Sequence, residues 1–156
     1  MNGIRHKWQR FSELDGRSRG LLLLSALLLP LFWLRVRLLG RERFAPADTP
    51  AAAAGEGAAS PETRAELAQI GRLVNIAAAQ VLPEGNCLTR SVYLQWLLRR
   101  RGIAADLRLG VQLQGGELLA HAWVEYAGNP INDSADVAER YAPFGRVQAS
   151  QVDVSS

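Results

Sequence analysis

Cysteine and histidine are scarce in this chain of 156 residues, and their scarcity excludes several kinds of site. The single cysteine excludes an internal disulfide, which fits a reducing cytosol, so we expect a cytoplasmic protein and leave membrane association open. The two histidines lie far apart in the sequence and no second cysteine accompanies them, so we expect no metal site. Neither a Walker phosphate loop nor a dinucleotide fingerprint is present, and we expect no cofactor.

The one thiol, Cys87, lies in a turn that leads directly into a strongly helical stretch at residues 88–101. A thiol in the first turn of a helix faces unpaired backbone N–H groups and the positive end of the helix dipole, which favours the thiolate. Free cysteines are also common as small buried apolar side chains, and this alternative stays open for Cys87 taken alone. His121 and Asp133 follow downstream, in the order that a nucleophile, a base and an orienting acid require.

Alternating apolar and polar residues predict two antiparallel strands that would bring the histidine and the aspartate together. Residues 105–114 alternate with period two, a pair of glycines turns the chain, and residues 118–126 return. We expect a third strand to begin at Ile131 and to run beside the second, so that Asp133 returns towards His121. Taken singly, the histidine could be a satisfied half-buried ring and the aspartate a turn residue.

Several short blocks of this region occur in a recognisable order and spacing. They are NCLTRS at 86–91, LLRRRGI at 97–103, LGV at 109–111, HAWVE at 121–125, glycine at 128 and ND at 132–133. Together they resemble the leader peptidase, or B protein, of lasso-peptide biosynthesis, in its stand-alone form. No block would suffice alone, and the resemblance covers residues 83–144.

The resemblance implies an α+β fold with a transglutaminase-like or papain-like core. In such a core the cysteine nucleophile lies at the N-terminus of a helix packed on a small antiparallel sheet, and N-terminal helices precede it. Carried over to this chain, the catalytic residues are Cys87 as nucleophile, His121 as general base and Asp133 as orienting acid. The implied activity is that of a cysteine endopeptidase that cleaves the leader from a ribosomally synthesised lasso precursor peptide through an acyl-enzyme.

The resemblance also implies partners. The freed core peptide would pass to an ATP-dependent macrolactam cyclase, so that ATP belongs to the partner. A small leader-recognition domain would deliver the precursor, but the first 50 residues contain leucine runs typical of helices and no credible set of strands to receive a peptide. We therefore expect leader recognition to be performed by a separate protein.

The N-terminal segment is basic and rich in leucine. Residues 1–43 contain nine basic and three acidic residues, a net charge of +6, whereas the remaining residues carry −3. A signal peptide is disfavoured because the apolar run at 21–34 starts late and no small-residue cleavage site follows it. A membrane span is disfavoured because the run is short and contains Pro30. We favour a helix that packs on the core or on a partner, with a position at the membrane surface left open.

These features divide the chain into four parts. Residues 1–44 form the basic leucine-rich helical segment, and residues 45–60 form a linker of alanine, proline and glycine. Residues 61–145 form the peptidase core, which begins with a helix capped by Ser60 and ending before Pro83. Residues 146–156 form a polar tail.

Two other functional classes remain open at this stage. The same three residues can transfer an acyl group to an amine, which would make the chain a transglutaminase-type acyl transferase. A non-catalytic scaffold could instead use the N-terminal helices to dock on partners or on a membrane. Nucleic-acid binding is not expected, because three arginines at 99–101 fit the solvated last turn of a helix.

Overall fold

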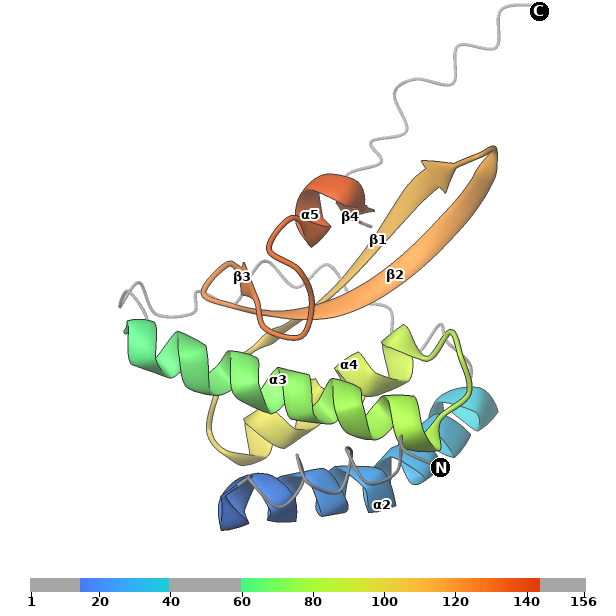
Figure 1. The fold of residues 1–156 in the computed structure, drawn as a ribbon. Helices are drawn as coiled ribbons and strands as arrows, with labels where there is room; N and C mark the ends of the chain where they lie inside the picture. Colours follow the sequence, from blue (N-terminus) through green and yellow to red (C-terminus); the bar gives the residue numbers. More distant parts are fainter. Residues whose placement is uncertain (1–14, 40–59, 144–156) are drawn as a thin grey trace, which may run out of the picture.

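The computed structural model describes residues 15–39 and 60–143, which form an α+β fold with helices stacked beneath an antiparallel sheet (Figure 1). This arrangement confirms the predicted fold class. The helices are α2 (Gly16–Leu39), α3 (Pro61–Val81), α4 (Cys87–Arg100) and α5 (Val137–Arg140), and the strands are β1 (Asp106–Gln114), β2 (Glu117–Tyr126), β3 (Asn129–Pro130) and β4 (Ala142–Pro143). The predicted polar tail and nearly all of the predicted linker lie outside the described residues.

Helix α3 begins where the sequence predicts, because Ser60 caps it and proline occupies its first turn. Ser60 Oγ accepts a hydrogen bond from the backbone N–H of Thr63 at 3.1 Å. The apolar face of the helix is buried as expected except at its last residue, Val81, which is 37% exposed. On the buried side, a Cβ at Gly71 would overlap the Ile131 carbonyl oxygen. The glycine therefore lets the chain after β3 lie directly against α3.

Helix α4 starts at Cys87 itself and forms the centre of the core. Tyr93, Leu94 and Leu98 are fully buried on its inner side. The helix stops because Gly102, with φ of +74°, takes a left-handed conformation that other residues adopt only at a cost. The predicted helix at 88–101 is thus confirmed, and its first turn contains the thiol.

Strands β1 and β2 form a tight hairpin. Gly115 and Gly116 both have positive φ, and they connect the facing residues Gln114 and Glu117 by a two-residue turn. In the resulting register Gly110 faces His121. The predicted hairpin is confirmed, and β2 begins one residue earlier than expected.

The prediction of a third strand starting at Ile131 is wrong in position and length. Strand β3 contains only Asn129 and Pro130, and residues 131–133 are irregular. The backbone N–H of Ile131 still donates to the Val124 carbonyl at 3.0 Å, but the N–H of Val124 is taken by the side-chain oxygen of Asn132 at 2.8 Å. The ladder ends there because a side chain replaces the backbone acceptor.

Helix α2 packs on α3 and α4 on the side away from the sheet (Figure 1). Leu21 and Leu29 belong to the same buried core as the residues of α3 and α4. The Tyr93 hydroxyl donates to Ser25 Oγ at 3.1 Å, which joins α2 to α4 by a buried hydrogen bond. The expectation that the leucine-rich segment packs on the core is therefore confirmed for residues 16–39, and the first 14 residues lie outside the described part.

Candidate active site

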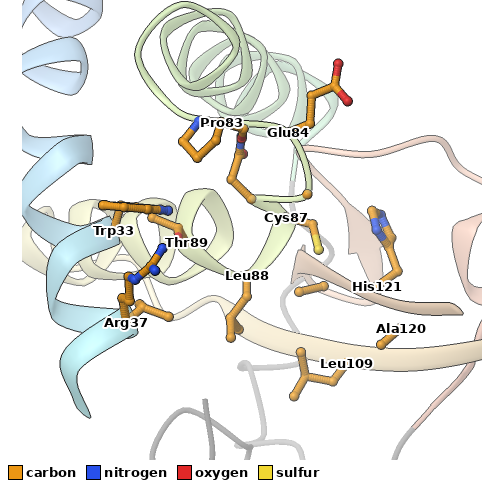
Figure 2. Close-up of a pocket in the computed structure, with 14 residues that line it drawn as sticks. Trp33, Arg37, Pro83, Glu84, Cys87, Leu88, Thr89, Leu109, Ala120 and His121 are labelled. Carbon is orange, nitrogen blue, oxygen red and sulfur yellow. The ribbon is translucent and has the colours of Figure 1, made fainter. Parts of the chain in front are cut away.

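Cys87 is the first residue of α4, and its thiol points towards His121 across a groove (Figure 2). The preceding residue, Asn86, does not cap the helix with its side chain, because that side chain donates to the Pro83 carbonyl instead. No side-chain oxygen of Asn86 therefore accepts from the first backbone N–H groups of α4. The positive end of the helix dipole lies next to the thiol.

His121 lies in β2 and is held by Asp133. Its Nε2 is 2.7 Å from Asp133 Oδ2, and both side chains are largely buried. With Nε2 engaged by the carboxylate, Nδ1 is the ring nitrogen left for the thiol of Cys87. The structure thus brings together all three residues that the sequence predicts for the site.

The Cys87 thiol and the His121 imidazole shift each other's pKa. Burial by itself raises the pKa of the Cys87 thiol, but a hydrogen bond with His121, the charge of that ring, the Ala122 backbone N–H and the charge of Arg90 outweigh it, so the pKa is lowered. The hydrogen bond with Cys87 raises the pKa of His121; burial opposes this rise, and the hydrogen bond and charge of Asp133 add to it. Opposite shifts of this kind favour a thiolate beside an imidazolium.

The carboxylate of Asp133 is itself held in an ionised state. Burial alone raises the pKa of Asp133, but hydrogen bonds from His121 and from the Ser134 backbone N–H, together with the charges of His121 and Arg90, lower it overall. The Ser134 N–H lies 2.9 Å from Oδ1. Arg90 Nη2 lies 3.5 Å from Oδ2, and Arg140 Nη2 lies 3.8 Å from Oδ1.

The sequence did not single out Arg90, although it lies one helical turn after Cys87 and therefore on the same side of α4. That spacing was a usable signal. Tyr141 was also missed, and it stacks on the His121 ring with centroids 4.8 Å apart. No local pattern points to it, because the short helix α5 and strand β4 bring it back from the end of the described chain.

The aromatic packing around the histidine depends on Gly110. A Cβ at this residue would lie 2.8 Å from Tyr141 Cβ and 3.0 Å from the edge of the Trp123 ring. Trp123 also stacks beside the histidine, with ring centroids 6.2 Å apart. Glycine at this point of β1 therefore leaves room for the rings that fix the orientation of His121.

The thiol opens into a groove of about 620 Å³. Its walls come from α2, from the turn before α4, from the start of α4 and from both long strands; Trp33, Arg37, Pro83, Leu88, Leu109 and Ala120 are among the residues that line it (Figure 2). The lining combines apolar side chains with one arginine, Arg37, and one glutamate, Glu84. Among residues 15–39 and 60–143, no group of three or more His, Cys, Asp or Glu is placed to hold a metal ion.

A helix-borne cysteine facing a histidine and an aspartate on an antiparallel sheet defines a class of α+β thiol proteins. The family model of the transglutaminase-like superfamily matches residues 29–146, and the chain belongs to this superfamily. The transglutaminase-like core that the sequence blocks implied is thereby confirmed, and the matched range includes the C-terminal part of α2.

Part of the chain is also similar in sequence to a protein of known role. The chain is 33% identical over 64 residues to the microcin J25-processing protein McjB of Escherichia coli. The match covers 41% of this chain and 30% of the relative, so the chain spans less than a third of the relative's length. No solved structure was found to match this chain.

Proposed function

We propose that this chain is a cysteine endopeptidase that removes the leader from a ribosomally synthesised lasso precursor peptide. The observation that carries the proposal is the 2.7 Å contact between His121 Nε2 and Asp133 Oδ2, which leaves the other ring nitrogen facing Cys87. Membership of the transglutaminase-like superfamily and the similarity to a microcin-processing protein support the same activity.

In the first half of the reaction, the Cys87 thiolate attacks the scissile carbonyl carbon and a C–S bond forms. The carbonyl oxygen becomes an oxyanion, for which the backbone N–H of Cys87 at the helix N-terminus is the first donor. The His121 imidazolium then gives its proton to the leaving nitrogen, and the C–N bond breaks. The core peptide leaves with a free amino terminus, and the leader stays bound as a thioester.

In the second half, neutral His121 takes a proton from a water molecule that attacks the thioester carbonyl. The C–S bond breaks, the leader leaves with a free carboxyl group, and the thiolate and imidazolium are restored. Asp133 keeps Nε2 protonated and stabilises the imidazolium throughout, because its own carboxylate stays ionised.

The shape of the groove favours a peptide as the substrate. Ala120 and Ala122 of β2 lie along it, and β3 pairs with β2 only at Glu125 and Tyr126. At Ala122 the backbone of this edge is already bonded to Ser91 and Cys87, but no described strand covers the outer edge of β2 before it, and an extended peptide could pair with the backbone there. Small side chains on this edge leave room for such a chain.

Two partners complete the proposal. A separate leader-recognition protein would deliver the precursor, and an ATP-dependent cyclase would consume the freed core peptide by forming the macrolactam. The thiolate must stay reduced for the reaction, so we place the protein in the cytoplasm.

The test is incubation of the full chain with the precursor and the leader-recognition protein, followed by mass measurement. Leader with a free carboxyl group and intact core peptide are expected, and a folded Cys87→Ala protein is the matched blank. A leader joined to an added amine, with no free carboxyl product, would identify acyl transfer instead. Equal cleavage by the Cys87→Ala protein would overturn the assignment of the nucleophile.

A further inference from the structure

Helix α2 carries a stripe of exposed leucines on the side away from the core. Leu27, Leu31 and Leu38 are 70%, 60% and 74% exposed. At about 100° per residue, the stripe fits in an arc of roughly 100° that runs the length of the helix. Its members, called here the outer leucine stripe, are Leu23, Leu24, Leu27, Leu31, Leu34 and Leu38.

The opposite arc of the same helix is buried. Leu21, Leu29 and Val36 lie there together with two serines that bond to the neighbouring helices. Soluble helices normally show one apolar stripe and one polar face, whereas α2 is apolar on both sides and the described protein covers only one of them. Contiguous exposed apolar surface of this kind marks an interaction site.

Arginines flank the outer leucine stripe on both sides and at both ends. At helical spacing, Arg17 and Arg35 fall along one border, and Arg19 and Arg37 fall along the other. Helix α2 contains no aspartate or glutamate. An apolar strip bordered by cations is complementary to a lipid surface whose acyl region lies beneath negatively charged headgroups.

The helix is long and apolar enough to cross a membrane by length and composition, but its contacts favour a flat position. The inner side of α2 is not available to lipid, because its serines accept hydrogen bonds from the Tyr93 hydroxyl of α4 and the Gln69 amide of α3. Crossing the bilayer would separate these contacts and uncover the core. The helix can therefore offer only its outer side.

We propose that the outer leucine stripe of α2 docks on an anionic lipid surface, with the helix axis parallel to that surface. The charges favour lipid over a second copy of the chain, because two stripes packed face to face would bring their arginine borders together. This inference does not depend on the catalytic roles proposed above.

Docking in this way would orient the active site. The sheet lies on the far side of the molecule from α2 (Figure 1), while Trp33 and Arg37 of α2 line the groove that leads to Cys87 (Figure 2). The groove would then open beside the headgroups, and the β1–β2 hairpin would point away from the lipid.

Binding of the full chain to lipid vesicles tests the proposal. The protein should sediment with vesicles of phosphatidylglycerol and phosphatidylcholine, and should bind pure phosphatidylcholine vesicles more weakly. The double variant Leu27→Asn, Leu31→Asn should lower the affinity about tenfold or more, since two largely exposed leucines lose their contact with the acyl region. The double variant Leu113→Asn, Leu118→Asn is the matched control, because these leucines are 71% and 68% exposed at the hairpin tip.

A second pair of variants tests the charges. Arg17→Gln with Arg35→Gln should weaken binding to the anionic vesicles and reduce its salt dependence, whereas Arg99→Gln with Arg101→Gln at the C-terminal end of α4 should not. Circular dichroism of each variant checks that the fold is kept.

Three results would overturn the proposal. The first is absence of vesicle binding by the folded wild-type chain. The second is equal loss of binding in the hairpin-tip variant and in the Leu27, Leu31 variant. The third is a lipid-free dimer that the Leu27, Leu31 substitutions dissociate, which would make the stripe an interface between copies.

Discussion

The side-chain amide of Asn132 donates a hydrogen bond to Ser91 Oγ at 3.1 Å, in the buried interior. Ser91 lies one turn after Cys87 on α4 and donates in turn to the Ala122 carbonyl of β2 at 3.0 Å. A single buried network thus joins the helix of the thiol, the strand of the imidazole and the segment of the carboxylate. This network therefore helps to hold the three groups in their relative positions.

Cys87→Ala should lower precursor cleavage by about 10⁴-fold or more without unfolding the protein, because a thioester can no longer form.

His121→Ala should be comparably damaging, since no other histidine lies in the described residues. It should also slow alkylation of Cys87 by iodoacetamide at neutral pH, because the imidazolium that stabilises the thiolate is gone. Unchanged alkylation in His121→Ala would show that the thiolate is formed without the imidazole.

Asp133→Asn should slow cleavage by roughly 10²- to 10⁴-fold. The amide has one oxygen, whereas Asp133 uses one oxygen for His121 and the other for the Ser134 N–H. The raised pKa of His121 depends partly on Asp133, and the proposed mechanism needs a protonated ring to donate to the leaving nitrogen. The alkaline limb of the kcat/KM profile should therefore move to lower pH in the variant. A wild-type profile would assign the orienting role to another group.

Arg90→Gln should shift the acid limb of the pH profile of kcat/KM. The charge of Arg90 helps to lower the pKa of Cys87, so its loss should raise that pKa and move the acid limb of the kcat/KM profile to higher pH. Arg90→Lys should restore part of the shift, and Arg99→Gln on the same helix is a matched control. A loss of activity with both limbs unmoved would indicate a structural role for Arg90.

Gly71→Ala should destabilise the fold by about 1–3 kcal/mol, because the added methyl group overlaps the Ile131 carbonyl oxygen. Gly20→Ala in α2 is the matched control, since nothing lies within 4 Å of its Cβ position, and it should stabilise by about 0.5–1 kcal/mol. Thermal melts of the two variants measure the difference. Equal melting temperatures would mean that the segment after β3 moves away without cost.

Removal of α2 should leave an aggregating chain. A fragment from Ser60 onward loses Leu21 and Leu29 from the core, and it exposes Tyr93 with its hydroxyl unpaired. A soluble fragment that melts cooperatively would contradict this prediction and make α2 an interaction module.

Within the full chain, Leu29→Ala should lower the free energy of unfolding by about 2–5 kcal/mol, whereas Leu27→Ala, on the exposed side, should change it by less than about 0.5 kcal/mol.

Local patterns in the sequence predicted the elements that hold the thiol and the histidine. Helix α4 has a strong apolar face and a glycine stop, and the hairpin has alternating strands around two glycines, so each is specified by neighbours in the chain. Asp133 was found by its order in the sequence, but the strand expected to place it ends before it, at Pro130. Its position depends on Asn132, which bonds to groups 8 and 41 residues away in the sequence.

Among the remaining site residues, Tyr141, Trp33 and Arg37 were not predictable for the same reason. Tyr141 reaches His121 only because β4 pairs with β1 in a two-residue ladder, and no periodicity can mark an element so short. Arg90 could have been found from its spacing to Cys87 alone. The contribution of Trp33 and Arg37 to the groove required the packing of α2, which depends on the three-dimensional arrangement of three helices.

The lowered pKa of Cys87 also has a consequence for the chemistry of peroxides. A lowered pKa favours the thiolate, which is the form that hydrogen peroxide oxidises, and the first product is a sulfenic acid. Such a group is normally rescued by a second thiol that closes a disulfide, but this sequence contains no other cysteine. Recovery must then come from an external small thiol before a second oxidation makes the damage permanent.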